Sequence, residues 1–65
     1  MTRTPLPFTL IRRDTRAACI VYRHDRADDG IVRLREFRGP DRLKRSRAFA
    51  EEYRAAARAE MEVAS

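Results

Sequence analysis

The sequence offers few of the special devices that stabilise or locate a short chain. Cys19 is the only cysteine, so no disulfide can form within the chain. No stretch approaches the ~18 consecutive apolar residues that a membrane span needs. The N-terminal MTRTPLPF also lacks the apolar run of a signal peptide. We therefore expect a soluble intracellular protein that does not enter a membrane.

Residues that carry catalysis are equally scarce. The chain has one histidine, His24, only two serines and no glycine-rich phosphate loop. Cys19 and His24 lie five positions apart on one expected strand and therefore point to opposite faces, which excludes a nucleophile and base pair. The acidic residues of segment 25–36 are spaced partly like those of a calcium-binding EF-hand loop, but Ala27 stands where that loop needs an oxygen ligand. We expect a protein that is not an enzyme and that holds no cofactor or metal.

The apolar residues that are present suffice for one small domain over residues 1–65. They make up 43% of the chain, but ten of them are alanines, so the expected core is thin. A domain of this size usually requires a covalent staple, a partner or a second copy of itself.

One segment, residues 41–63, has an unambiguous helical period. Side chains that can face a core recur there at spacings of three and four, which places them on one stripe of a helix. Gly39 and Pro40 precede the segment as a start signal, and Asp41 is the expected cap. The stripe comprises Leu43, Ser46, Phe49, Ala50, Tyr53, Ala56, Ala57 and Met61.

The segment before the helix is expected to form three short strands, each rich in β-branched and other apolar residues. Pro7 confines the first strand to a sheet edge or to the strand's beginning, because proline cannot donate to a ladder. The middle run is apolar on both faces, which is typical of a central strand. The strands are expected over residues 6–13, 17–23 and 31–38, with turns over 14–16 and 25–30.

Together these elements predict an α+β fold, a three-stranded antiparallel meander with one C-terminal helix packed on one face (βββα). The sheet covers residues 6–38, and residues 1–5 form a frayed tail. Gly30 in the second turn is free to adopt a positive φ. A two-stranded hairpin with an irregular first segment is the alternative.

Alternation along the strands predicts which side chains share a face. Phe8, Leu10, Val32 and Leu34 are expected to face the helix. Either parity of the central strand could face inward; Ala18, Ile20 and Tyr22 form the bulkier set for a core. That choice leaves Cys19, Val21 and Arg23 on the outer side. The opposite face would then carry Arg13, Arg23, Arg33 and Arg35 around Ile11, Val21 and Phe37, with Ile31 beside them. A basic rim around an apolar centre is typical of a protein interface, although an ordinary exposed sheet face has the same composition.

The charge of the chain favours a polyanionic partner. There are 15 basic and 10 acidic residues, a net charge of +5, and Lys44 is the only lysine. Guanidinium groups bind phosphate or carboxylate bidentately, although a GC-rich genome also enriches arginine. Basic residues crowd the first two turns of the helix, where they oppose the helix dipole and where unpaired N–H groups attract anions. We predict partner binding by Arg42, Lys44, Arg45 and Arg47, together with Arg13, Arg23, Arg33, Arg35 and Phe37.

Two functions fit these features. The first is a protein-interaction module that docks on an acidic protein or nucleoprotein complex, with a homodimer through the sheet face as a further alternative. The second is a nucleic-acid-binding module whose sheet enters the major groove while the basic helix start grips phosphates. The second resembles the arm-type DNA-binding domains of phage integrases in its βββα order.

The chain also resembles anti-CRISPR proteins of phages and mobile elements, which are often single compact domains of this size without catalytic residues or a recognisable motif. That resemblance implies a stoichiometric inhibitor that binds a CRISPR effector complex in the cytoplasm of a bacterial host. We favour a protein partner because Asp28, Asp29 and Glu36 lie near the face that would read DNA.

Overall fold

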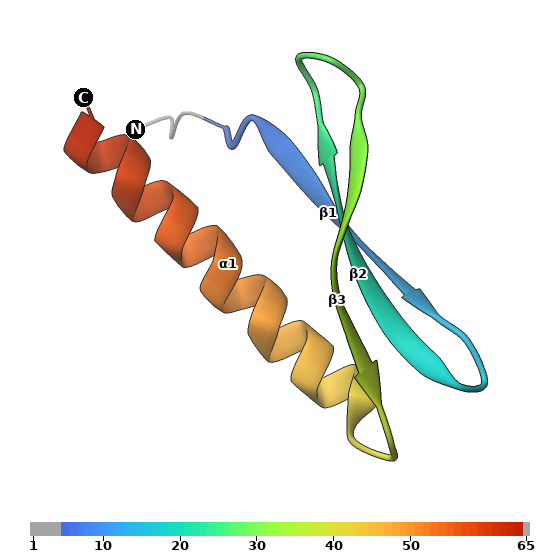
Figure 1. The fold of residues 1–65 in the computed structure, drawn as a ribbon. Helices are drawn as coiled ribbons and strands as arrows, with labels where there is room; N and C mark the ends of the chain where they lie inside the picture. Colours follow the sequence, from blue (N-terminus) through green and yellow to red (C-terminus); the bar gives the residue numbers. More distant parts are fainter. Residues whose placement is uncertain (1–4, 65) are drawn as a thin grey trace.

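The computed structural model describes residues 5–64 and has the predicted βββα order (Figure 1). The strands form one antiparallel sheet in which β2 is central, so the predicted fold class is confirmed. The predicted frayed tail, apart from Pro5, lies outside the described residues. The elements are β1 (Phe8–Asp14), β2 (Ala18–Asp25), β3 (Ile31–Arg38) and α1 (Arg42–Ala64).

The chain reverses between β3 and α1 at a glycine. Gly39 has a φ of 96°, a conformation that a residue without a Cβ adopts without strain. The carbonyl of Asp41 accepts a hydrogen bond from the N–H of Arg45 at 2.9 Å, the first bond of the helix. Asp41 therefore stands at the predicted cap position.

The turn between β2 and β3 contains one residue in the left-handed region. The positive φ, 58°, belongs to Asp29 and not to Gly30. An Asx turn explains this, because Asp28 Oδ1 accepts the N–H of Gly30 at 2.9 Å and aspartate tolerates the left-handed region. The N–H of Asp25 donates to the carbonyl of Gly30 at 2.9 Å and closes the hairpin.

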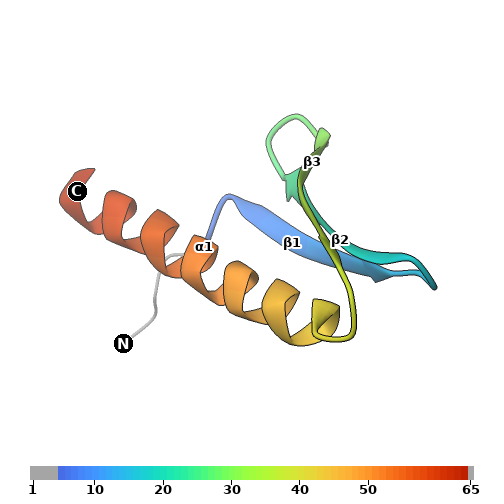
Figure 2. The same cartoon turned by 60° about the horizontal axis from the view of Figure 1, so that its bottom comes forward.

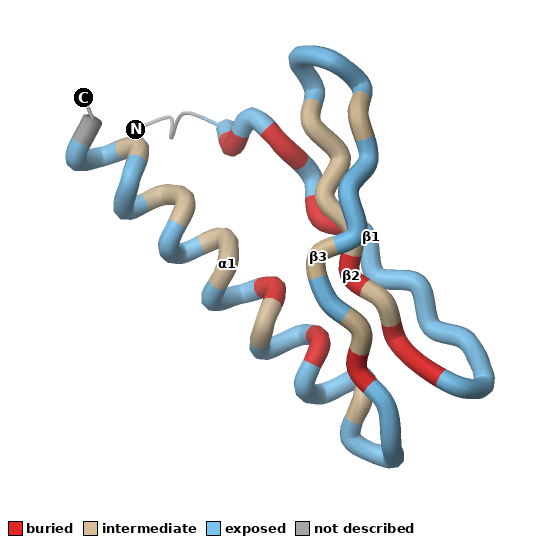
Figure 3. The backbone as a smooth tube through the Cα atoms, in the orientation of Figure 1, coloured by how far each residue is buried: buried red, intermediate tan, exposed pale blue. Residues whose placement is uncertain are grey.

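The main core lies between the helix and one face of the sheet (Figure 3). The predicted helical stripe faces this core except for Leu43, which is 48% exposed, and Ala56, which is exposed. The buried cluster is formed by Leu6, Phe8, Leu10 and Ala50, with Leu34, Tyr53, Ala57 and Met61 packed against it.

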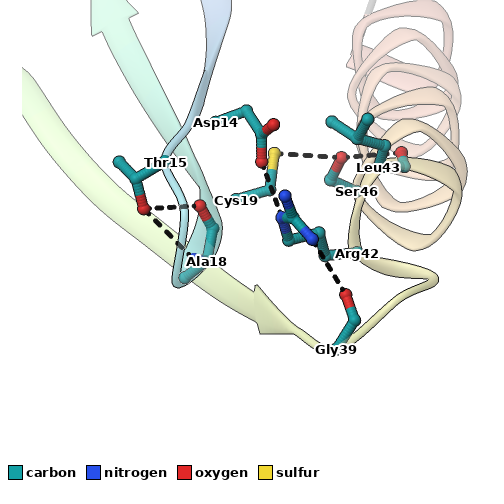
Figure 4. A network of polar contacts seen from close by, with 8 residues as sticks. All are labelled: Asp14, Thr15, Ala18, Cys19, Gly39, Arg42, Leu43 and Ser46. Atoms are coloured by element: carbon teal, nitrogen blue, oxygen red, sulfur yellow. Dashed lines mark hydrogen bonds and ion pairs between the residues drawn. The ribbon is translucent and has the colours of Figure 1, made fainter.

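A second group of contacts fastens the start of the helix to the end of the sheet (Figure 4). The thiol of Cys19 donates to Ser46 Oγ at 3.3 Å, and Ser46 donates to the carbonyl of Leu43 at 2.8 Å. Both Cys19 and Ser46 are fully buried. Nearby, Nε of Arg42 donates to Oδ1 of Asp14 at 2.8 Å. These contacts fix the place where α1 meets β1 and β2.

The helix crosses only one face of the sheet and leaves the other uncovered (Figure 2). It runs diagonally, so the tip of the β2–β3 hairpin extends past it (Figure 1). This explains why Val32 is 55% exposed even though it shares the helix side. Within residues 5–64 no helix has the length and apolar character needed to cross a membrane.

Candidate interaction surfaces

The central strand has the opposite orientation to the one predicted. Leu10 pairs with Arg23, and Asp14 pairs with Cys19, so the odd-numbered residues of β2 share the helix side with β1's core residues. Val21 and Cys19 are fully buried there. Ile20 and Tyr22 are half-buried on the helix-free face. The placement of Cys19, Val21 and Arg23 on the outer side is therefore wrong.

The turn between β1 and β2 is the physical cause. The N–H of Thr15 donates to the carbonyl of Ala18 at 2.8 Å. The Thr15 hydroxyl donates to the same carbonyl at 3.0 Å and accepts the N–H of Ala18 at 3.1 Å (Figure 4). These bonds leave only Arg16 and Ala17 at the tip. The predicted turn over residues 14–16 implies a pairing shifted by an odd number of residues, and such a shift moves every side chain of a strand to the other face.

A β-bulge causes the second difference, in β3. Val21 pairs with Arg35 while Tyr22 pairs with Arg33, so Leu34 has no partner in the ladder. Before the bulge, Arg33 faces away from the helix as predicted. After it, Arg35 and Phe37 lie on the helix side, which corrects their predicted outward placement. Phe37 is only 5% exposed.

The helix-free face, here called the outer face, carries an apolar centre. Ile31 is 62% exposed and Ile11 is 41% exposed, and α1 covers only the opposite face of the sheet (Figure 2). The predicted outer face does not include Ile20, Tyr22 and Arg38. The turn-forming Thr15 is the sequence signal that identifies Ile20 and Tyr22, whereas the bulge at Leu34, which sets the face of Arg38, has no such signal. The register assigns to the outer face Ile11, Arg13, Ile20, Tyr22, Ile31, Arg33, Glu36 and Arg38.

The outer face keeps a positive rim. Glu36 Oε2 accepts a hydrogen bond from Nε of Arg38 at 2.6 Å, and Nη1 of Arg33 lies 3.9 Å from Glu36 Oε1. The bond from Arg38 lowers the pKa of Glu36 below its ordinary value, so this carboxylate stays ionised at more acidic pH than a free glutamate. Arg13 has no carboxylate partner within the described part of the chain. Three arginines therefore face one glutamate.

Arg23 belongs to a group of residues on the helix side, here called the paired cluster: Phe8, Arg23, Asp25 and Tyr53. Its guanidinium carbon lies 4.2 Å from the centroid of the Phe8 ring. Arg23 donates twice to Asp25 Oδ1, at 2.8 and 3.0 Å, and once to the Tyr53 hydroxyl at 2.9 Å. The bonds to Asp25 and Tyr53 raise the pKa of Arg23. Arg23, which is predicted to bind a partner, therefore uses its hydrogen-bond donors within the fold.

A second group, here called the open cluster, consists of Arg35, Phe37, Arg45 and Phe49. The guanidinium carbon of Arg35 lies 5.3 Å from the Phe37 centroid and 5.7 Å from the Phe49 centroid. That of Arg45 lies 5.6 Å from the Phe37 centroid. The two rings are 5.7 Å apart at an interplanar angle of 56°. The contacts bring two predicted partner-binding arginines together, one from β3 and one from α1.

The remaining basic residues at the helix start divide into bound and free side chains. Arg42 is occupied by Asp14 and by the carbonyl of Gly39 (Figure 4). Lys44 and Arg47 are exposed, and neither side chain has a hydrogen-bond or ion-pair partner among residues 5–64. Only part of the predicted basic cluster is therefore free to meet a partner.

Among the described residues, no group of three histidine, cysteine, aspartate or glutamate side chains could hold a metal ion. Comparison with protein-family models, with curated proteins and with solved structures finds no match to this chain. The geometry of these surfaces is therefore the basis for inferring a function.

Proposed function

We propose that this chain is a non-enzymatic binding protein whose outer face docks on a partner protein. The observation that supports this most directly is a sheet face with exposed isoleucines that no part of the described chain covers. Removal of apolar surface from water contributes about 25 cal/mol per Å². Ile11 and Ile31 are the most exposed apolar side chains on this face and would anchor the contact.

The charge of the rim selects an acidic partner. Arg13, Arg33 and Arg38 outnumber Glu36, so a complementary surface has an apolar centre bordered by carboxylates. Long-range attraction between such surfaces accelerates their encounter. Two copies of the outer face would bring an excess of arginine together, which disfavours the homodimer alternative.

The same face is poorly suited to nucleic acid. Isoleucine side chains provide no hydrogen bonds to base edges or phosphates. Glu36 would also lie near phosphates and repel them. A protein surface satisfies both the apolar centre and the basic rim. A CRISPR effector complex, which the resemblance to anti-CRISPR proteins implies, is one partner that the experiment below can reveal.

A capture experiment with a matched control tests this proposal. The immobilised chain is incubated with a lysate of the cells in which it functions, and retained proteins are identified and quantified. Ile31→Asp places a charge on the outer face at the start of β3, beside the β2–β3 turn. Val63→Asp places one at the end of α1, where Val63 is 88% exposed. We expect a stoichiometric partner that the original chain and the Val63 variant retain and the Ile31 variant loses.

Circular dichroism of both variants should show the folded spectrum, because both side chains are exposed. A partner that the Ile31→Asp variant still retains in full would contradict docking through the outer face. Light scattering that shows a dimer of the original chain and a monomer of this variant would assign the face to a second copy instead.

A further inference from the structure

The open cluster lies on the helix side of the sheet, away from the outer face, and it presents a different chemistry. We propose that it binds the phosphodiester backbone of a nucleic acid, with Arg35 and Arg45 as the main contacts. This inference is independent of the proposed function, because it uses other side chains.

The first support is the orientation of the two guanidinium groups. Each lies within 6 Å of the centroid of the Phe37 ring, and Phe37 is itself buried and fixed against Phe49. A guanidinium held over a ring keeps its in-plane N–H groups available for bidentate bonds to an oxyanion. Part of the entropy of ordering these side chains is therefore already lost before a ligand binds.

The second support is that these donors are unused. Neither the Arg35 nor the Arg45 side chain forms a hydrogen bond or an ion pair within residues 5–64, and both residues are exposed. Arg23, by contrast, is held over Phe8 but donates three hydrogen bonds to Asp25 and Tyr53. The open cluster therefore has two guanidinium groups over aromatic rings, but no acceptor for them among the described residues.

The third support is the local charge. Lys44 and Arg47 add two free positive charges to the same end of α1, and the first turn of this helix contains no acidic residue. Asp14 is already occupied by Arg42. Several separate positive charges at one end of the molecule suit the regularly repeated single charges of a nucleic-acid backbone.

The test measures binding of the full chain to a labelled random-sequence DNA duplex by fluorescence anisotropy, at salt concentrations from about 20 to 150 mM. Arg35→Gln/Arg45→Gln should lower the affinity by roughly tenfold for each lost contact. It should also reduce the slope of log K against log salt by about 1.8, since each phosphate contact contributes about 0.9.

The matched control is Arg16→Gln/Arg26→Gln. This double variant removes the same charge from two exposed turn residues whose side chains have no partner in the described chain. We expect it to change affinity and slope much less. Equal losses in the two double variants, or no binding of the original chain at low salt, would overturn the proposal.

Three further measurements guard against loss of fold, a wrong ligand class and a contribution from the outer face. Arg35→Lys/Arg45→Lys keeps both charges and should retain the salt slope with weaker binding, because lysine lacks the planar fork. Polyglutamate replaces DNA in a parallel titration. If the glutamine variant loses only polyglutamate binding, the site recognises an acidic polypeptide and the proposal fails. Ile31→Asp should bind DNA like the original chain, which keeps this test separate from the outer face.

Discussion

The paired cluster and the open cluster both lie on the helix side of the sheet and are built from the same parts. In each, arginine lies over phenylalanine and a strand side chain meets an aromatic residue of α1. They differ in the anion, because Asp25 and Tyr53 satisfy Arg23 whereas nothing in the described chain satisfies Arg35 or Arg45. An arginine therefore serves the fold or faces a partner according to its acceptors, and the arginine content of the chain does not distinguish the two roles.

The largest expected effect is a loss of stability on replacing Phe37, the buried ring of the open cluster. Phe37→Ala removes a side chain that is 5% exposed and should cost about 3–5 kcal/mol. That is most of the stability of a domain this small. Guanidinium chloride unfolding followed by circular dichroism measures the change. Tyr22→Ala, on the outer face and half-buried, is the control and should cost clearly less; equal losses would mean that Phe37 is not a core residue.

The second prediction compares the arginines of the two clusters directly. Arg23→Gln loses the ion pair to Asp25 and leaves the Tyr53 hydroxyl without its donor. Arg35→Gln loses only its contacts with rings. Thermal unfolding should therefore show a larger fall in Tm for Arg23→Gln than for Arg35→Gln. Similar falls would remove the distinction between the clusters.

A double-mutant cycle sharpens that comparison. Asp25→Asn combined with Arg23→Gln should destabilise by less than the sum of the two single changes, because both remove the same pair. The same cycle between Asp25 and Arg35 should be additive, since no contact joins these residues.

Most of the architecture could be predicted from the sequence because it depends on local periodicity. The spacing of Ser46, Ala50, Tyr53 and Ala57 identified the buried stripe of the helix, and runs of β-branched residues identified the strands. The faces on which the surface side chains lie could not be predicted from periodicity alone. They depend on strand register, which is set by the turn that Thr15 closes and by the bulge at Leu34.

Those two features decide the face of every side chain that follows them. Phe37 alternates in sequence as an outward residue, but the skipped Leu34 turns it into the core. Arg23 was expected on the outer face and instead ties β2 to Tyr53. No residue count along the chain reveals such a shift, because it results from hydrogen bonds between strands.

The third prediction tests the turn that sets this register. Thr15→Ala removes the hydroxyl that accepts the N–H of Ala18 and should cost on the order of 1 kcal/mol. Urea unfolding measures it. Thr15→Ser keeps the hydroxyl and should recover most of the loss, whereas equal losses for alanine and serine would mean that the hydroxyl does not hold the turn.

The smallest expected effect concerns the outer face, where Arg38 pairs with the Glu36 carboxylate. The arginines of the open cluster have no such partner in the described chain. Because Arg38 lowers the pKa of Glu36 in the folded state, the pair stabilises the fold fully above the ordinary glutamate value of about 4.5. This contribution is lost as the pH falls through the lowered folded value. The Tm of Glu36→Gln should therefore lie slightly below that of the original chain at neutral pH, and the two should converge in acid. A gap that stays constant or widens in acid would show that Glu36 acts through packing and not through its charge.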